Sequence, residues 1–549
     1  MTDTFQYDYI IVGAGSAGCV LANRLSRDAS VRVCLIEAGP PDTSPFIRMP
    51  GGLMFLMDNR RLNWRFSTDP EPHLNGRRLY CPRGKVLGGS SAINGMIYIR
   101  GHRGDYDGWA VEAGEDWSYD AVLPIFRELE NNQRGGDAYH GSEGELYVSD
   151  VRDIDHLQLL FVASGEAAGL PPNPDFNGAE QDGVGLYQTT THEGRRCSAA
   201  EAFLRPVQAR PNLTVMTDSK VRRVLFDGLR ATGVEVGDRR GRRQEIFCQR
   251  EVVLSAGVIQ SPQLLMLSGI GPSAELGRHG LAPLVDLPGV GQNLQDHIDI
   301  LVSHKSAHPQ ALGWTPRAAL RFLSGLWQYW RSGRGLLATN MTYAGGFARS
   351  RPGLDRPDLQ LHFFSGIMQD HGRKIMFGKG FSAHVCNLRP NSRGQVTLRS
   401  ADPLDDPLIQ FNYLGDSQDM QAMIAGLRLA RRILGSPPLA RWSRGEFLPG
   451  PQHQSDEELA DAIRQQAETI YHPVGTCRMG RDEMSVVDPQ LRVRGVSGLR
   501  VADASIMPTL ISGNTNATAM LIGEKCARYM QAAAESGAPS GGATVERRV

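Results

Sequence analysis

The stretch of sequence that decides the fold is Tyr7-Asp8-Tyr9-Ile10-Ile11-Val12-Gly13-Ala14-Gly15-Ser16-Ala17-Gly18. Its first half is a short apolar run of the kind found in buried parallel strands. A Gly-x-Gly-x-x-Gly loop follows directly, and residues 19–25 then show a helical pattern. In such a strand–turn–helix the first glycine permits the turn, the second lets the backbone approach a pyrophosphate, and the third allows close packing of helix on strand. The free N–H groups of the helix N-terminus bind the phosphates.

A second apolar run, residues 31–36, ends in the acidic residue Glu37. An acid at this distance from the loop binds ribose hydroxyls, and it disfavours the extra phosphate of NADP. A glycine loop alone can be an ordinary turn. The combination of strand, loop, helix, second strand and acid predicts a dinucleotide site, with NAD and FAD both still open.

Length and charge limit the other possibilities. A chain of 549 residues exceeds one simple core, so two closely packed domains are expected. The 59 basic residues balance the 59 acidic ones, so no nucleic-acid partner is expected. The eight Cys show no metal-ligand spacing, and we expect reduced thiols and no metal site. With neither a signal peptide nor a bilayer-spanning apolar run, the chain is expected to be cytoplasmic, either free or attached peripherally to the inner face of the membrane.

Five later stretches carry residues suited to binding a cofactor or to catalysis. They are residues 83–97 (RGKVLGGSSAINGMI), 257–271 (GVIQSPQLLMLSGIG), 471–480 (YHPVGTCRMG), 499–508 (LRVADASIMP) and 513–518 (GNTNAT). Taken singly they are ambiguous, because the first fits a surface loop and the His before Pro fits a loop histidine with a structural role.

Together, these stretches resemble the glucose–methanol–choline (GMC) family of FAD-dependent oxidoreductases, in the family's order, from about residue 7 to residue 530. The likeness is strongest to bacterial primary-alcohol and polyethylene glycol dehydrogenases and to choline dehydrogenase. The resemblance implies an α/β fold, α+β overall, with a Rossmann-like FAD-binding domain and a discontinuous cap domain containing a mainly antiparallel sheet and helices.

The implied FAD-binding domain comprises residues 5–40, 80–150, 215–310 and 490–530, and the implied substrate or cap domain comprises 40–80, 150–215 and 310–490. Within the cap, strands are predicted at 357–366, 382–389 and 395–400, and helices at 419–434 and 457–468. Residues 535–549 are small and polar and predict a disordered tail.

By the same resemblance, His472 is the general base and Asn516 is its partner. An imidazole can take the proton of an alcohol, and an amide can donate a hydrogen bond to the developing alkoxide. Ile93 replaces the His through which some members attach FAD, so non-covalent FAD is expected. The implied FAD-binding residues are Gly13, Gly15, Ser16, Ala17, Gly18, Glu37, Ala38, Arg83, Gly88, Ser90, Asn94, Gly95, Met96, Ile97, Val221, Ala256, Asp503, Ala504 and Asn516.

The implied reaction is oxidation of a primary alcohol to an aldehyde, with hydride transfer to the flavin and electrons passed to a quinone or similar acceptor. The alternatives are a choline dehydrogenase, an oxygen-using alcohol oxidase and a non-redox lyase of the same fold.

The segment 318–334 places apolar side chains at helical spacing beside three arginines. We favour a cap helix that faces the core, and a membrane-surface helix is the alternative.

Overall fold

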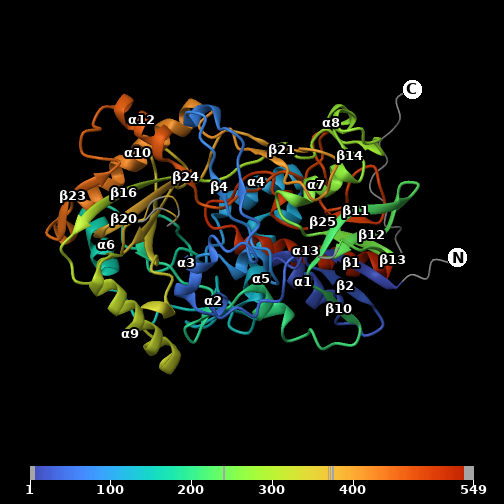
Figure 1. Cartoon of the computed structure of the whole chain (residues 1–549), viewed down its shortest axis with the longest axis horizontal. Coiled ribbons are helices and arrows are strands. Elements are labelled where there is room, and N and C mark those ends of the chain that lie inside the picture. Colours follow the sequence, from blue (N-terminus) through green and yellow to red (C-terminus); the bar gives the residue numbers. More distant parts are fainter. Residues whose placement is uncertain (1–5, 239–240, 369, 371–372, 374–375, 537–549) are drawn as a thin grey trace.

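The computed structural model describes residues 6–238, 241–368, 370, 373 and 376–536. Two sheets organise the chain, one at each end of the molecule (Figure 1). One is mostly parallel and carries the N-terminal strand–turn–helix, and the other is antiparallel. The predicted fold class, a Rossmann-like domain with a cap, is confirmed.

The parallel sheet is built around β1 (Tyr7–Val12), which pairs with β2 (Val33–Ile36) on one side and with β13 (Arg243–Leu254) on the other. β10 (Leu213–Met216) and β25 (Leu499–Val501) continue it in parallel. The antiparallel strands β11 (Ser219–Asp227) and β12 (Arg230–Asp238) extend β13. Helices α1 (Ser16–Leu25) and α13 (Asn516–Ser536) pack against each other beside this sheet.

The glycines of the N-terminal loop are required by close backbone contact. A Cβ atom on Gly18 would lie 1.9 Å from the carbonyl oxygen of Gly13, and Gly13 itself has a φ of +100°. α1 therefore lies so close to β1 that no side chain fits between them, as the glycine spacing predicts.

The antiparallel sheet has the order β23-β16-β20-β19-β18-β7, with β24 and β17 paired to β16 and β20. The bounds are β7 (Gly183–Leu186), β16 (Ile298–Ser306), β17 (Leu312–Trp314), β18 (Ala344–Ala348), β19 (Leu359–Phe364), β20 (Gly378–Asn387), β23 (Ser443–Leu448) and β24 (Glu468–Thr469). β16 thus pairs in this sheet, although the sequence interpretation placed residues 298–306 with the FAD-binding domain.

The secondary structure predicted for these segments is largely confirmed. β19 and β20 cover the first two predicted strands, and α10 (Ser417–Leu434) and α12 (Asp456–Gln466) cover the two predicted helices. The third strand, β21 (Gln395–Thr397), pairs with β22 (Leu408–Gln410) outside the large sheet. Glu468, predicted as the end of a helix, belongs to β24 instead.

The remaining elements connect and cover the two sheets. They are α2 (Pro45–Arg48), α3 (Leu53–Leu56), β3 (Phe66–Ser67), β4 (Tyr80–Cys81), α4 (Arg103–Ala113), α5 (Tyr119–Leu129), β5 (Glu130–Asn132), β6 (Leu146–Val148), α6 (His156–Ala167), β8 (Thr191–His192), β9 (Arg195–Arg196), α7 (Gln260–Leu267), β14 (Ile270–Gly271), α8 (Ser273–Arg278), β15 (Val285–Asp286), α9 (Pro316–Ser332) and α11 (Pro437–Ala440). In the part of the chain that the model describes, no helix is both long and apolar enough to cross a bilayer. The predicted tail lies, from residue 537 on, outside the described residues.

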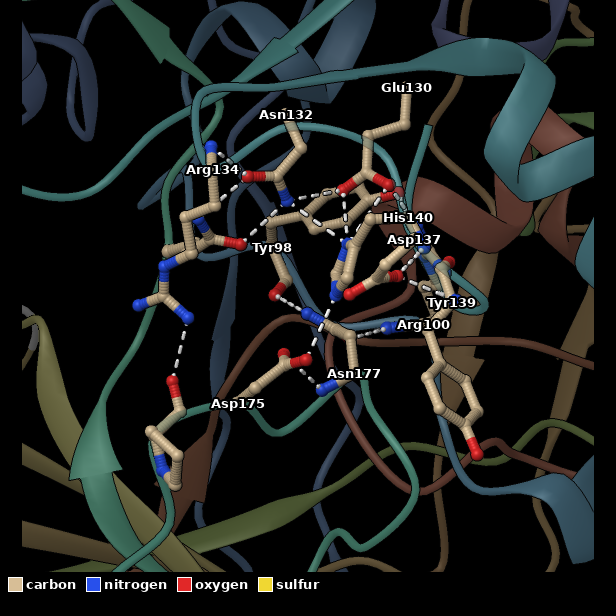
Figure 2. A network of polar contacts seen from close by, with 12 residues as sticks. Tyr98, Arg100, Glu130, Asn132, Arg134, Asp137, Tyr139, His140, Asp175 and Asn177 are labelled. Atoms are coloured by element: carbon tan, nitrogen blue, oxygen red, sulfur yellow. Dashed lines mark hydrogen bonds and ion pairs between the residues drawn. The ribbon is translucent and has the colours of Figure 1, made fainter. Parts of the chain in front are cut away.

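A buried polar network joins three connecting segments (Figure 2). His140 lies between two acids: its Nδ1 is 3.1 Å from Glu130, and its Nε2 is 2.9 Å from Asp175. Burial alone would lower the pKa of His140, but the hydrogen bonds to Asp175 and Glu130 raise it to about 9. Arg100 pairs with the same glutamate. A protonated His140 therefore ties residues 100, 130–140 and 175 together.

The contact between Gly18 and Gly13 predicts a sharp asymmetry between two glycine substitutions. Gly18→Ala should lower the free energy of unfolding by about 3 kcal/mol or more, because helix and strand must separate. In the matched control, Gly108→Ala, the new Cβ meets nothing within 4 Å on the exposed side of α4. The control should gain about 0.5–1 kcal/mol. Urea titration of the two variants measures both effects, and equal stability would contradict the close packing.

Candidate active site

A large cavity of about 1050 Å³ lies between the two sheets. Its walls include the carboxyl ends of β1 and β2 and the inner face of the antiparallel sheet, which is where ligands bind in open α/β folds. His472 and nearly all of the predicted cofactor residues line it: Gly13, Gly15, Ser16, Ala17, Glu37, Ala38, Arg83, Ser90, Asn94, Gly95, Met96, Ile97, Val221, Ala256, Asp503, Ala504 and Asn516.

Two predicted residues, Gly18 and Gly88, are not among the lining residues. Gly18 serves the packing of α1 on β1, as described above. Gly88 has a φ of +89°, and its N–H donates to the carbonyl of Ala14 over 2.7 Å. This hydrogen bond holds the second glycine-rich stretch against the first, although Gly88 itself does not line the cavity.

The dinucleotide end of the cavity fits a pyrophosphate and a ribose. Among the described residues no side chain caps the N-terminus of α1, so its first N–H groups are available to bind a phosphate. Glu37 follows β2 and accepts hydrogen bonds from the backbone of Ala14 (2.9 Å) and Gly39 (2.8 Å). These bonds fix the carboxylate and leave lone pairs for ribose hydroxyls. Burial raises the pKa of Glu37 to about 7.

The second glycine-rich stretch is anchored by an arginine. Arg196 is buried, and its Nη1 donates to both the carbonyl oxygen and Oδ1 of Asn94 over 2.7 Å. Asn94 Oδ1 also accepts from the N–H of Met96. Ile93 lines the same wall, and its alkyl side chain has no atom that could bond covalently to a flavin.

Asp503 joins two segments of the chain that line the cavity. It accepts hydrogen bonds from the N–H of Gly257 (2.8 Å), the hydroxyl of Ser261 (2.6 Å) and the N–H of Ser505 (2.8 Å). The turn at Gly257 is thereby joined to the strand-to-turn segment after β25.

His472 lines the part of the cavity next to the antiparallel sheet, three residues after β24. Asp296 accepts a hydrogen bond from its backbone N–H over 2.7 Å and so fixes the main chain. The ring contacts two side chains: its Nδ1 lies 3.0 Å from Nδ1 of His297, and its Nε2 lies 3.0 Å from Nδ2 of Asn514. Burial, together with the neighbouring His297, His362 and Arg83, holds the pKa of His472 well below its usual range. The ring is therefore neutral near pH 7.

The predicted pairing of His472 with Asn516 is corrected by this geometry. The partner is Asn514, which precedes helix α13. Asn516 is the first residue of α13, and its Oδ1 accepts a hydrogen bond from the hydroxyl of Ser16 over 2.7 Å. Asn516 therefore faces the dinucleotide end, and Asn514 faces the histidine.

Only one assignment of donors and acceptors satisfies the hydrogen bonds around His472. The carbonyl of Leu388 lies 3.1 Å from Nε2 of His297 and can only accept, so this nitrogen carries the proton. Burial lowers the pKa of His297 to about 3, so its ring is neutral and its Nδ1 accepts. His472 must then donate from Nδ1, which leaves its Nε2 as an acceptor. Asn514 donates to that nitrogen, and Gln360 donates to Asn514 Oδ1 over 3.2 Å.

The sequence interpretation missed His297, Gln360 and Arg196. His297 is followed directly by β16, in a stretch without any recognised motif. Gln360 and His362 alternate in the predicted strand 357–366, and this period of two places both on one face of the sheet. That alternation of polar residues in a buried strand was the available sign of a lined cavity.

Comparison with known proteins agrees with this geometry. The GMC oxidoreductase family matches residues 7–299 with its N-terminal model and residues 390–523 with its C-terminal model. An alcohol dehydrogenase [acceptor] from Pseudomonas putida is 51% identical over 527 residues, 96% of each chain. An oxygen-dependent choline dehydrogenase from Brucella anthropi is 42% identical over 96% of this chain and 95% of the relative.

Among solved structures, a pyridoxine 4-oxidase from Mesorbium loti superimposes with a TM-score of 0.87 at 33% identity, over 96% of this chain and 99% of that one. The two family matches include His472 and every predicted cofactor residue. The chain belongs to the GMC oxidoreductase family and is an FAD-dependent enzyme that oxidises alcohols.

Proposed function

We propose that the protein oxidises a primary alcohol to its aldehyde, with His472 as general base and Asn514 as its hydrogen-bonding partner, and passes the electrons to a quinone. The observation that carries the proposal is the neutral His472 ring, whose Nε2 accepts a hydrogen bond from Asn514 at the cavity wall. Removal of an alcohol proton requires a neutral imidazole with a lone pair that can accept that proton, and Nε2 carries it here.

In the proposed mechanism the alcohol hydroxyl approaches His472 Nε2 and donates its proton there. Asn514 already donates toward this nitrogen, and it can donate instead to the substrate oxygen as negative charge develops. His297 stabilises the protonated ring, because its Nδ1 accepts the hydrogen bond from His472 Nδ1. FAD, when bound, supplies the acceptor for the hydride that leaves the alcohol carbon.

The proposed cofactor contacts follow the cavity wall. The α1 N-terminus would hold the pyrophosphate, Glu37 the ribose, and residues 90–97 the flavin end, with non-covalent attachment. The proposed FAD-binding domain comprises 5–40, 80–150, 215–297 and 490–530, and the cap receives β16 with the rest of the antiparallel sheet. Val221, Ala256, Asp503 and Ala504 would complete the FAD site.

Apolar residues of the cavity favour an alcohol with an alkyl part. Leu301, Leu312, Phe364 and Ile367 line the wall, so the substrate chain can lose water as it binds. All three relatives named above carry oxidoreductase names, which disfavours the lyase alternative. Because quinones dissolve in lipid, we also propose a cytoplasmic enzyme attached peripherally to the inner face of the membrane.

Choline oxidation is the second candidate, supported by the choline dehydrogenase relatives. A quaternary ammonium needs open aromatic faces. Trp64 lines the cavity, but Lys85 Nζ lies 4.4 Å and Lys220 Nζ 5.3 Å from its ring centroid. These cations compete for the ring and repel a second cation. Bleaching of the flavin by choline and not by hexan-1-ol would favour choline over the leading proposal.

His472→Ala should abolish turnover while FAD remains bound, because the base is lost and the dinucleotide end is unchanged. Anaerobic mixing with hexan-1-ol should reduce the flavin at least 10²-fold more slowly than in the wild type. The flavin absorbance of the purified variant reports whether the cofactor is retained. Unchanged reduction would remove His472 from the mechanism.

Substitution of Asn514 and of Asn516 should have different effects, one on the rate of flavin reduction and the other on FAD binding. Asn514→Ala should slow anaerobic flavin reduction by roughly 10²-fold, because it removes the donor at His472 Nε2. Asn516→Ala should weaken FAD binding and leave the reduction rate of the bound flavin within about threefold of the wild type. The reverse assignment of these two effects would contradict the proposed roles.

The low pKa of His297 predicts a loss of stability in acid. Unfolded His297 takes up a proton below its ordinary pKa of 6.5, whereas folded His297 does so only near pH 3. Its contribution to stability is therefore full above pH 6.5 and decreases as the pH falls toward 3. Between about pH 7.5 and about pH 5 it should lose about 2 kcal/mol.

His297→Gln, which does not titrate, should show a correspondingly smaller decrease in unfolding free energy over the same pH interval. Urea titrations of the wild type and the variant at both pH values give the difference directly. An identical pH dependence would mean that His297 is not buried in its neutral form.

A further inference from the structure

The outer side of α9 is an exposed apolar stripe. Leu320, Leu323, Trp327 and Trp330 recur at helical spacing, and Trp327 and Trp330 are 62% and 88% exposed. A second stripe of the same helix, Phe322, Leu326 and Tyr329, packs on the body of the protein around Leu337. α9 therefore carries apolar side chains toward the protein and toward the outside, and it projects from the edge of the molecule (Figure 1).

The stripe continues directly to the mouth of the cavity. Leu323 lines the cavity and is also exposed, and the same holds for Met54 and Phe55 of α3. The ring of Phe55 packs edge-on against Phe322 of α9, with centroids 5.9 Å apart. The opening of the substrate cavity is thus bordered by an apolar surface from two helices, which we call the mouth surface.

The charged residues of α9 and of the segments that flank it in the sequence are all basic. Residues 300–354 contain no Asp or Glu. Arg331 and Arg334 are exposed beside the stripe, and the Arg331 guanidinium lies 5.5 Å from the centroid of the Trp327 ring. Exposed tryptophans with arginines alongside suit the interface of a membrane, where the rings enter the headgroup layer and the cations meet anionic lipid.

We propose that the mouth surface binds an anionic phospholipid bilayer, so that the cavity opens directly into the lipid. Deepening the function proposed above, this arrangement would let an apolar alcohol enter the site from the membrane without crossing water. The occupant is a bilayer and not a protein groove because the surface includes a helix that projects from the molecule, carries exposed arginines and borders an entrance (Figure 1). A second copy of the chain would close that entrance.

Vesicle sedimentation tests the binding. Vesicles of equal parts phosphatidylcholine and phosphatidylglycerol should sediment the wild-type holoenzyme, and pure phosphatidylcholine vesicles should sediment at least tenfold less. Trp327→Ser with Trp330→Ser should lower partitioning to the anionic vesicles at least tenfold. The matched control, Leu229→Ser with Leu404→Ser, removes exposed leucines elsewhere and should partition like the wild type.

A fluorescent label tests which surface inserts. All eight native Cys are buried, so a single surface Cys can be labelled selectively. An environment-sensitive dye at Trp330→Cys should shift to the blue on anionic vesicles, whereas the same dye at Leu404→Cys should not. Equal shifts at the two positions, or none at Trp330→Cys, would overturn the proposal.

Activity separates this proposal from the function itself. Trp327 and Trp330 do not line the cavity among the described residues, so the double variant should keep the wild-type kcat and KM for dissolved hexan-1-ol without vesicles. Loss of that activity would indicate a fault in the enzyme rather than in docking. Membrane docking would be refuted if the double variant partitioned to anionic vesicles like the wild type. It would also be refuted if the wild type did not bind vesicles and instead formed a dimer that the two substitutions dissociate.

Discussion

The carbonyl of Leu388 is a group that can only accept a hydrogen bond, and the direction of the whole catalytic cluster depends on it. It holds the proton of His297 on Nε2, which turns Nδ1 of that ring into an acceptor for His472. The lone pair of His472 then lies on Nε2, where it accepts a hydrogen bond from Asn514. A backbone atom at the end of β20 thus sets the tautomer of a side chain far away in the sequence.

This arrangement requires the antiparallel sheet. Leu388 directly follows β20, His297 directly precedes β16, and Gln360 lies in β19, and these three strands pair side by side. Their register places the carbonyl of Leu388 and the side chains of His297 and Gln360 around His472 and Asn514. Burial then keeps both histidines neutral, since desolvation is the largest cause of their lowered pKa values. The antiparallel sheet therefore sets the protonation and orientation of the proposed base, which the N-terminal glycine loop does not.

The strand, loop and helix of the N-terminal part could be predicted from the sequence because their determinants are local. The apolar strand, the glycines and Glu37 are close in the chain, and each has a distinct backbone role. The sequence did not identify the partner of His472, because the two candidate asparagines differ only in the direction of their side chains. Asn514 and Asn516 are separated by one residue, and the start of α13 between them turns one toward His472 and the other toward Ser16. His297 escaped notice because its role depends on β-sheet register, which no local spacing records.

Neutron diffraction of deuterium-exchanged crystals tests the account most directly, because it locates the protons on the two histidines. Deuterium is expected on His297 Nε2 and on His472 Nδ1, and none is expected on His472 Nε2. Deuterium on His472 Nε2 would contradict it, because the ring would then have no lone pair directed at Asn514 and the substrate.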